Sequence, residues 1–166
     1  EYASADKRFT ASAGLRADGC DYSGRMARVW RQLSPRASVS YAVGPGWSVS
    51  GSAGLYCQLP PYTALGFKEE DALVNRSLDY MRVGVFSAGV DWRLRDRLIV
   101  SVEGFYKRYG DVPLSVADGI PLSCKGNDYG VVGNEKLVSS AQGRAYGVEA
   151  MARWQIPGRV SVVGSV

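Results

Sequence analysis

Apolar and polar side chains alternate along most of this chain, and this alternation limits its possible folds more than any other feature. From Trp47 to Leu55, every second residue is apolar or small, and the residues between them are serine or glycine. A period of two residues matches a β-strand, whose successive side chains point to opposite faces, and does not match the 3.6-residue period of a helix. We therefore expect an all-β chain whose antiparallel sheet has one apolar and one polar face.

The same alternation predicts about seven strands. They cover residues 8–18, 36–43, 47–58, 83–94, 98–109 and 146–155, and a last strand starts at Val160. The opposite rows of these strands are polar, and their charged members include Arg16, Asp91, Arg93, Glu103, Lys107, Glu149 and Arg153. We expect these charges to pair across neighbouring strands. Contact with another part of the protein is the alternative.

Short and long connections follow one another strictly between the predicted strands. The short ones lie at 44–46, 95–97 and 156–159, and they contain turn residues such as Gly44-Pro45-Gly46 and Pro157-Gly158. The long ones lie at 19–35, 59–82 and 110–145. In an antiparallel meander, all short turns then lie at one end of the sheet and all long loops at the other. Outer-membrane barrels sort their connections in this way, with short periplasmic turns and long extracellular loops.

Aromatic residues stand at both ends of the apolar rows. Beside the short turns lie Tyr41, Trp47, Trp92 and Trp154. At the other ends we expect Phe9, Phe86, Tyr106 and Tyr146. Trp and Tyr favour the headgroup level of a membrane, so these residues are predicted to form its interface girdle. The eight residues from Tyr146 to Trp154 span about 26 Å of strand, or roughly 20 Å of membrane when tilted about 40°.

Four segments resemble the barrel of TonB-dependent outer-membrane receptors. They are "LSPRASVSYAV" (33–43), "YCQLPPYTALGF" (56–67), "VEGFYKRYGDVPLSV" (102–116) and "DYGVVGNEKLVSSAQGRAYGVEA" (128–150), of which "QLPPYT" and "GRAYGVE" are the most specific. The resemblance extends over almost the whole chain. It implies a transmembrane, up-and-down barrel of about 22 strands in the bacterial outer membrane, which surrounds an amino-terminal plug. It also implies uptake of a large, scarce solute (a metal chelate, cobalamin or a glycan) with energy supplied through the TonB complex.

No plug, TonB-box-like segment or aromatic carboxy-terminal end is recognisable in residues 1–166. We therefore interpret these residues as an internal segment from the later part of the barrel. Its expected partners are outer-membrane lipid, the plug and remaining strands, the TonB complex and the solute. A passive porin or smaller channel is one alternative, which the presence of a plug would exclude. A soluble β-sandwich that binds a protein or carbohydrate is the other, which requires a second layer over the apolar face.

The resemblance implies that ligand contacts come from extracellular loops and from upper lumen-facing side chains. The candidates in this chain are Gln58, Tyr62, Asp128, Tyr129 and Arg144. The Pro60-Pro61 pair stiffens the backbone before Tyr62 and could hold its ring at the barrel mouth, although such a pair also simply ends a strand.

Several classes of site are not expected. The chain has no histidine, the usual general base and a common zinc ligand, and no Walker, GxGxxG or HExxH motif, so we predict neither catalysis nor a cofactor. Its net charge of +4 is spread along the chain, unlike the basic patch of a nucleic-acid-binding protein. Acidic residues 69–71 lack EF-hand spacing and predict a solvated loop rather than a calcium site. Asn75-Arg76-Ser77 forms a glycosylation sequon, which we interpret as incidental.

The cysteines number three, at Cys20, Cys57 and Cys124, with no CxxC spacing. An odd number argues against a closed disulfide framework. Free thiols are therefore expected, and a bridge between Cys20 and Cys124 is the alternative.

Overall fold

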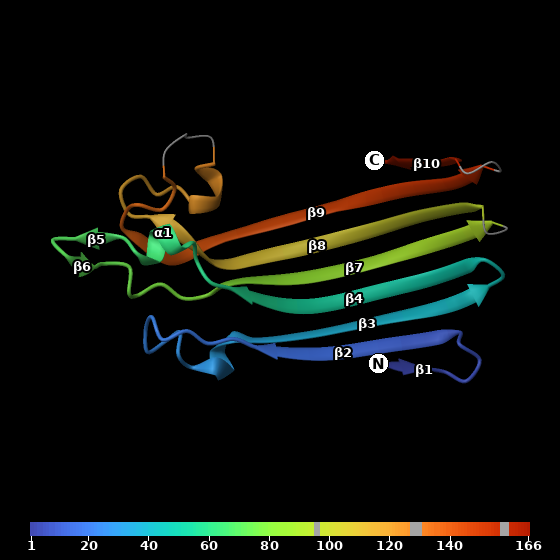
Figure 1. Ribbon diagram of the computed structural model, residues 1–166, viewed down its shortest axis with the longest axis horizontal. Coiled ribbons are helices and arrows are strands. Elements are labelled where there is room, and N and C mark those ends of the chain that lie inside the picture. The colour runs from blue at the N-terminus through green and yellow to red at the C-terminus, as the bar shows by residue number, and fades with distance from the viewer. Residues whose placement is uncertain (95–96, 127–130, 157–159) are drawn as a thin grey trace.

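A single antiparallel meander dominates the computed structural model, which describes residues 1–94, 97–126, 131–156 and 160–166 (Figure 1). Eight strands pair in the order β1-β2-β3-β4-β7-β8-β9-β10. Their bounds are Tyr2–Ala3 (β1), Phe9–Ala17 (β2), Leu33–Gly44 (β3), Trp47–Gln58 (β4), Met81–Leu94 (β7), Leu98–Ser115 (β8), Leu137–Ile156 (β9) and Val160–Ser165 (β10). The prediction of an all-β, antiparallel, up-and-down sheet is confirmed. The sheet is open, with β1 and β10 at its edges.

Strand number and several strand bounds differ from the sequence prediction, most of all in β8 and β9. The two residues of β1 pair with β2 and add an eighth strand, because a pair of residues is too short to show alternation. β8 continues to Ser115 and β9 begins at Leu137, beyond the predicted limits at 109 and 146. The pairing of these two strands shifts between Tyr109 and Val112, and Asp111 there has a φ of 56°. This irregularity interrupts the alternation on which the predicted limits rested.

The connections are sorted as predicted, with every long loop at one end of the sheet (Figure 1). The loops contain η1 (Val29–Gln32), α1 (Tyr62–Leu65), β5 (Lys68–Glu69), β6 (Ala72–Leu73) and η2 (Leu122–Cys124). At the other end, the β3–β4 turn requires glycine at position 46, where φ is +76° and a Cβ would lie 2.2 Å from the Arg93 carbonyl oxygen. The turns predicted at 95–97 and 156–159 fall largely outside the described residues. In the described part, no helix combines the length and apolarity needed to cross a bilayer.

The strand register carries apolar rows across one face and polar rows across the other. One line of paired residues on the first face, here called the outer face, runs through Tyr41, Val49, Val90, Val102 and Ala150. One line on the second, inner face runs through Ser40, Ser50, Gly89, Glu103 and Glu149. Serine hydroxyls bond across the inner face, 2.8 Å apart for Ser12–Ser38 and 2.9 Å for Ser52–Ser87.

Large apolar side chains of the outer face are open to their surroundings. Exposed fractions are 50% for Val39, 56% for Phe86 and 71% for Val148. A soluble sandwich would bury these side chains under a second layer, and within the described residues the sheet has no such layer. The outer face is therefore a large apolar surface, which marks a binding or membrane-contact face.

Aromatic residues lie at both ends of the outer face. At the loop end, Phe86, Tyr106 and Tyr146 pair in one line across three strands. At the turn end, the Trp47 and Trp92 rings stack, with centroids 5.6 Å apart, and Trp154 is half-exposed. The prediction for Phe9 was wrong: it pairs with Tyr41 and lies at the turn end, because β2 enters the sheet from a short turn.

Candidate functional site

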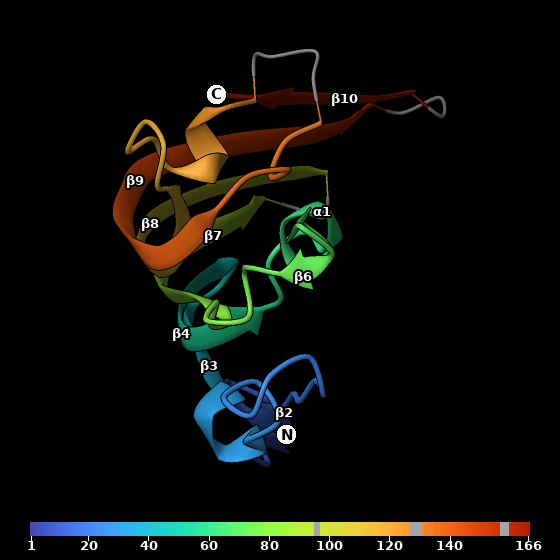
Figure 2. The ribbon, with the colours of Figure 1, turned by 90° about the vertical axis from the view of Figure 1, so that its left-hand side faces the viewer.

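The long loops pack into one body with its own apolar core. This loop body consists of residues 19–32, 59–80, 116–126 and 131–136 and lies at the loop end of the sheet. Its middle segment, with α1 and β6, lies on the concave side of the curved sheet (Figure 2). All three loop segments, with the start of β9, contribute buried side chains, namely Met26, Ala64, Leu65, Leu78, Tyr80, Leu122 and Leu137. The apolar core of the described chain thus lies in its loops rather than in its sheet. A packed core holds loops in one arrangement, as a binding surface requires.

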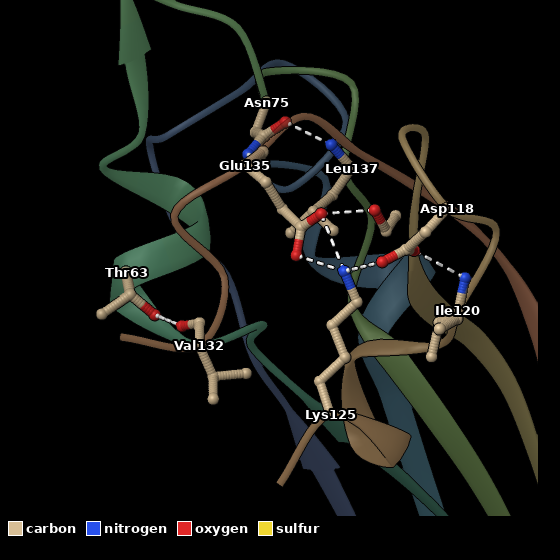
Figure 3. Close-up of polar contacts among 9 residues, drawn as sticks. Thr63, Asn75, Asp118, Ile120, Lys125, Val132, Glu135 and Leu137 are labelled. Atoms are coloured by element: carbon tan, nitrogen blue, oxygen red, sulfur yellow. Dashed lines mark hydrogen bonds and ion pairs between the residues drawn. The ribbon is translucent and has the colours of Figure 1, made fainter. Parts of the chain in front are cut away.

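Asn75 is the polar centre of the loop body (Figure 3). Its side chain is fully buried. Its Nδ2 donates to the carbonyl oxygens of Ala64 at 2.7 Å and Glu135 at 2.9 Å, and its Oδ1 accepts from the Leu137 amide at 2.9 Å. One amide therefore ties the middle loop to the segment that leads into β9. The sequon that begins at Asn75 is not accessible.

A second tie within the loop body is an ionic cluster around Lys125 (Figure 3). Its Nζ lies 2.7 Å from an oxygen of Asp118 and 2.7 Å from one of Glu135, and the Ser115 hydroxyl also donates to Glu135. Lys125, helped by the Ile120 amide, lowers the pKa of Asp118 to about 2. Hydrogen bonds from Lys125 and Ser115 likewise lower the pKa of Glu135, and the two carboxylates raise the pKa of Lys125. The cluster is therefore fully charged at neutral pH.

A third tie joins α1 to the last loop. The Thr63 hydroxyl donates to the Val132 carbonyl oxygen at 2.7 Å (Figure 3). Next to it, Gly133 has a φ of +93°, and a Cβ there would lie 3.0 Å from Thr63 Oγ1. The close approach of these two segments therefore needs glycine at position 133.

A cavity of about 880 Å³ lies at the loop end of the strands. Strand residues and the segment around η2 border it. Its polar and aromatic lining includes Arg16, Asp18, Tyr56, Gln58, Tyr80, Arg82, Tyr109 and Arg144. A cavity of this size is typical of ligand sites.

Charges in this cavity are only partly neutralised. Arg16 pairs with Asp18 at 2.8 Å, two residues away along the chain rather than across strands. Arg82 lies 3.4 Å from Asp111, and the second carboxylate oxygen of Asp18 has no hydrogen-bond partner among the described residues. Burial raises the pKa of Tyr80, so its hydroxyl remains protonated at neutral pH. The cavity thus offers guanidinium and phenol donors and one free acceptor.

The predicted ligand residues do not all gather at this cavity. Gln58 and Arg144 border it. Tyr62 begins α1 with its side chain 81% exposed, and is not among the residues described as bordering the cavity. Asp128 and Tyr129 lie outside the described residues.

Sequence reasoning missed the cavity tyrosines. Tyr56 and Tyr109 occupy inner-face positions of β4 and β8 near the loop end. Strand alternation alone predicts this placement, so the sequence did contain the signal for these two residues. Tyr80 precedes β7, and no sequence pattern indicated its burial.

Metal and disulfide sites are not formed by the described residues. They contain no group of three or more metal-ligating His, Cys, Asp or Glu side chains. Residues 69–71 lie around the β5–β6 turn, where Glu70 and Asp71 have positive φ angles. All three cysteines are free, which leaves the alternative Cys20–Cys124 bridge unformed.

Comparison with models of known protein families shows to which family of β-sheet proteins this chain belongs. Residues 1–165 match the family model for the TonB dependent receptor-like β-barrel. The chain belongs to this TonB-dependent receptor family. A search of curated protein sequences gave no match for the receptor segment.

Solved structures share the fold of this receptor segment. The FrpB iron transporter of Neisseria meningitidis (F5-1 variant, apoprotein form) superposes with a TM-score of 0.56 at 16% identity, over 95% of this chain and 23% of that chain. Its F3-3 variant gives the same TM-score and identity, over 95% of this chain and 22% of its own. The closed form of the ferric-catecholate import receptor Fiu from E. coli K12 gives 0.59 at 15% identity, over 92% of this chain and 24% of its own. The chain therefore spans about a quarter of the length of these neighbours.

The inner face of the receptor segment holds two carboxylates directly opposite each other. Glu103 of β8 pairs with Glu149 of β9 in the register. The expected cross-strand pairing of opposite charges is therefore wrong at this position, and like charges in this arrangement are destabilising. Neither carboxylate has an ion-pair partner among the described residues.

Proposed function

We propose that this chain forms part of the wall and the extracellular mouth of an active transporter in the bacterial outer membrane. The observation that carries this proposal is the cavity at the loop end, which the barrel strands and a rigidly packed loop body border together. In an outer-membrane barrel, long loops face the outside. The cavity then lies where a solute from the medium first meets the protein.

An anionic metal chelate fits this cavity best among the solutes that such receptors take up. Three arginines and one aspartate, Arg16, Arg82, Arg144 and Asp18, border it, so its charge balance is positive. Phenol rings from Tyr56 and Tyr109 add stacking surfaces and hydrogen-bond donors. The names of the structural neighbours, an iron transporter and a ferric-catecholate import receptor, agree with this choice.

The plug is the partner that we propose for the inner face. Glu103 and Glu149 face the space that a plug would fill, and two adjacent carboxylates need a cation. A lysine or arginine of the plug satisfies both. Energy from the inner membrane then reaches the barrel through the plug and TonB.

Uptake by the full-length receptor tests the proposal. Cells that express it are given ⁵⁵Fe as a ferric catechol chelate, with and without TonB. We expect uptake that requires TonB and that falls severalfold in an Arg16→Gln variant. Arg8→Gln, an exposed change at the turn end, serves as the matched control. TonB-independent uptake would instead support the passive-channel alternative.

A further inference from the structure

One arginine lies among small side chains on the inner face, next to the loop-end cavity. Arg36 of β3 pairs with Gly14 of β2 on one side and with Gly54 of β4 on the other. A Cβ built on Gly14 would lie 3.3 Å from Arg36 Nε, so the arginine side chain extends across Gly14. Two residues further towards the loop end on β2 and β4, Arg16 and Tyr56 border the cavity. Arg36 therefore lies about 7 Å along the strands from the cavity lining, on its turn side.

The Arg36 guanidinium is open to the inner face. Arg36 is exposed, and among the described residues it has no ion-pair partner. Lys107 is the other cation on the same line of paired residues, which runs through Gly54 and Val85. Lys107 Nζ instead lies 4.8 Å from the centroid of the Phe105 ring, an arrangement that stabilises a cation. Arg36 thus keeps its hydrogen-bond donors available for an anion from outside the described residues.

A second cavity continues beyond Arg36 towards the turn end. Its volume is about 390 Å³, and its lining includes Ser38 and Ser52. Ser38 follows Arg36 by two residues, so alternation places both on the inner face. Ser48 and Asp91 border a third cavity of about 380 Å³ at the turn end. All three cavities lie along β4 and β7, and Arg36 lies between the first and the second.

The wall formed by β2, β3 and β4 carries only positive charge. The sequences of these strands contain Arg16 and Arg36 and no Asp or Glu. On the wall of β8 and β9, the inner face instead holds the facing carboxylates Glu103 and Glu149, and Glu103 also borders the second cavity. An anion in the lumen is therefore attracted towards β2–β4 and repelled from β8–β9.

We propose that Arg36 binds the anionic metal chelate after the chelate leaves the loop-end cavity, as a second subsite on its way along the β2–β4 wall. The inference rests on the proposed function and adds a step that the cavity residues do not supply. The guanidinium can donate two parallel hydrogen bonds to carboxylate or catecholate oxygens. Beyond it, Ser38 and Ser52 offer neutral hydroxyls, which hold an anion less tightly than a guanidinium does. The chelate can therefore move on towards the turn end.

Separate measurements of binding and uptake by the full-length receptor test this subsite. The probe is a ferric catechol chelate labelled with ⁵⁵Fe. Its binding is measured in cells without TonB, and its maximal uptake rate in cells with TonB. Arg36→Gln is expected to leave the Kd unchanged and to lower the maximal rate about tenfold, as for the loss of a charge-assisted hydrogen bond in a step after binding. Arg36→Lys retains the charge without the bidentate geometry and should give an intermediate rate.

Three further variants distinguish the subsite from its surroundings. Arg16→Gln changes the cavity itself and is expected to raise the Kd. The matched control is Lys107→Gln, which removes the other cation on the same line of the inner face and should give wild-type binding and uptake. Arg36→Met removes the guanidinium in a second way and is expected to behave like Arg36→Gln. Heat-modifiable migration on gels reports barrel formation in each variant.

Three uptake results would overturn the inference: a wild-type maximal rate in folded Arg36→Gln and Arg36→Met, an equal loss of rate in Lys107→Gln, or a raised Kd in the Arg36 variants, which would make Arg36 part of the cavity. Faster hydrogen–deuterium exchange of the plug in solute-free Arg36→Gln would identify a plug contact and would also overturn it. TonB-dependent wild-type uptake that the Arg36 variants do not slow contradicts this inference alone. Wild-type uptake that does not require TonB contradicts the proposed function.

Discussion

Replacing Asn75 by alanine should loosen the whole loop body without changing the barrel. The substitution removes three hydrogen bonds of 2.7, 2.9 and 2.9 Å. It leaves two carbonyl oxygens and one amide unpaired in a fully buried site. Each buried unpaired group costs about 1–3 kcal/mol, so the loop body should lose about 3 kcal/mol or more of its stability against local opening.

Hydrogen–deuterium exchange of the full-length receptor measures this opening directly. A loss of about 3 kcal/mol corresponds to exchange about a hundredfold faster at amides that exchange through local opening. We expect this in peptides from 19–32, 59–80, 116–126 and 131–136, with unchanged protection in β7 and β8. Asn134→Ala is the matched control, because Asn134 is exposed in the same segment. Wild-type exchange in Asn75→Ala, or equally fast exchange in the control, would refute the role assigned to Asn75.

Three further perturbations have defined outcomes. The pKa of Asp118 falls to about 2 in the folded state from an ordinary 3.8, so its ion pair stabilises the last loop above about pH 4 and loses this effect as the pH falls towards 2. Limited acid proteolysis with pepsin should show this loss, and Lys125→Gln should weaken the pH dependence, because the Ile120 amide still lowers the pKa of Asp118. Gly46→Ala places a Cβ 2.2 Å from a carbonyl oxygen and should lower the yield of folded barrel, measured by heat-modifiable migration. Val49→Arg puts a charge on the outer face and should cost about 2–4 kcal/mol of folding free energy in lipid, measured by urea titration in bilayers; Ser50→Arg on the inner face should cost much less.

The sheet was predictable from the sequence because its signal is local. Alternation between Trp47 and Leu55, or between Tyr146 and Trp154, is visible within a single strand, and so is the sorting of the connections. Phe9 was misplaced although the sorting of the connections already gave its position: the long loop 19–35 follows β2, so Phe9 at the start of β2 lies at the turn end.

The loop body was not predictable in the same way. Met26, Leu78 and Leu137 come from segments far apart in the chain and meet only in the folded protein, so they show no periodicity. Asn75 appeared only as an incidental sequon, because its role depends on backbone groups of Ala64 and Glu135. Pairs such as Glu103–Glu149 likewise require the register between strands, which a single sequence does not supply.

Lipid contact of the outer face is the central claim, and electron paramagnetic resonance along β7 tests it most directly. Spin labels are placed one at a time at positions 86–90 of the full-length receptor in bilayers, with the native cysteines replaced by serine. We expect high collision rates with oxygen, which partitions into lipid, at 86, 88 and 90, and low rates at 87 and 89. The water-soluble reagent NiEDDA should give lower rates at 86, 88 and 90 than at 87 and 89. Equal accessibility at all five positions, or water contact at Ala88, would contradict the account.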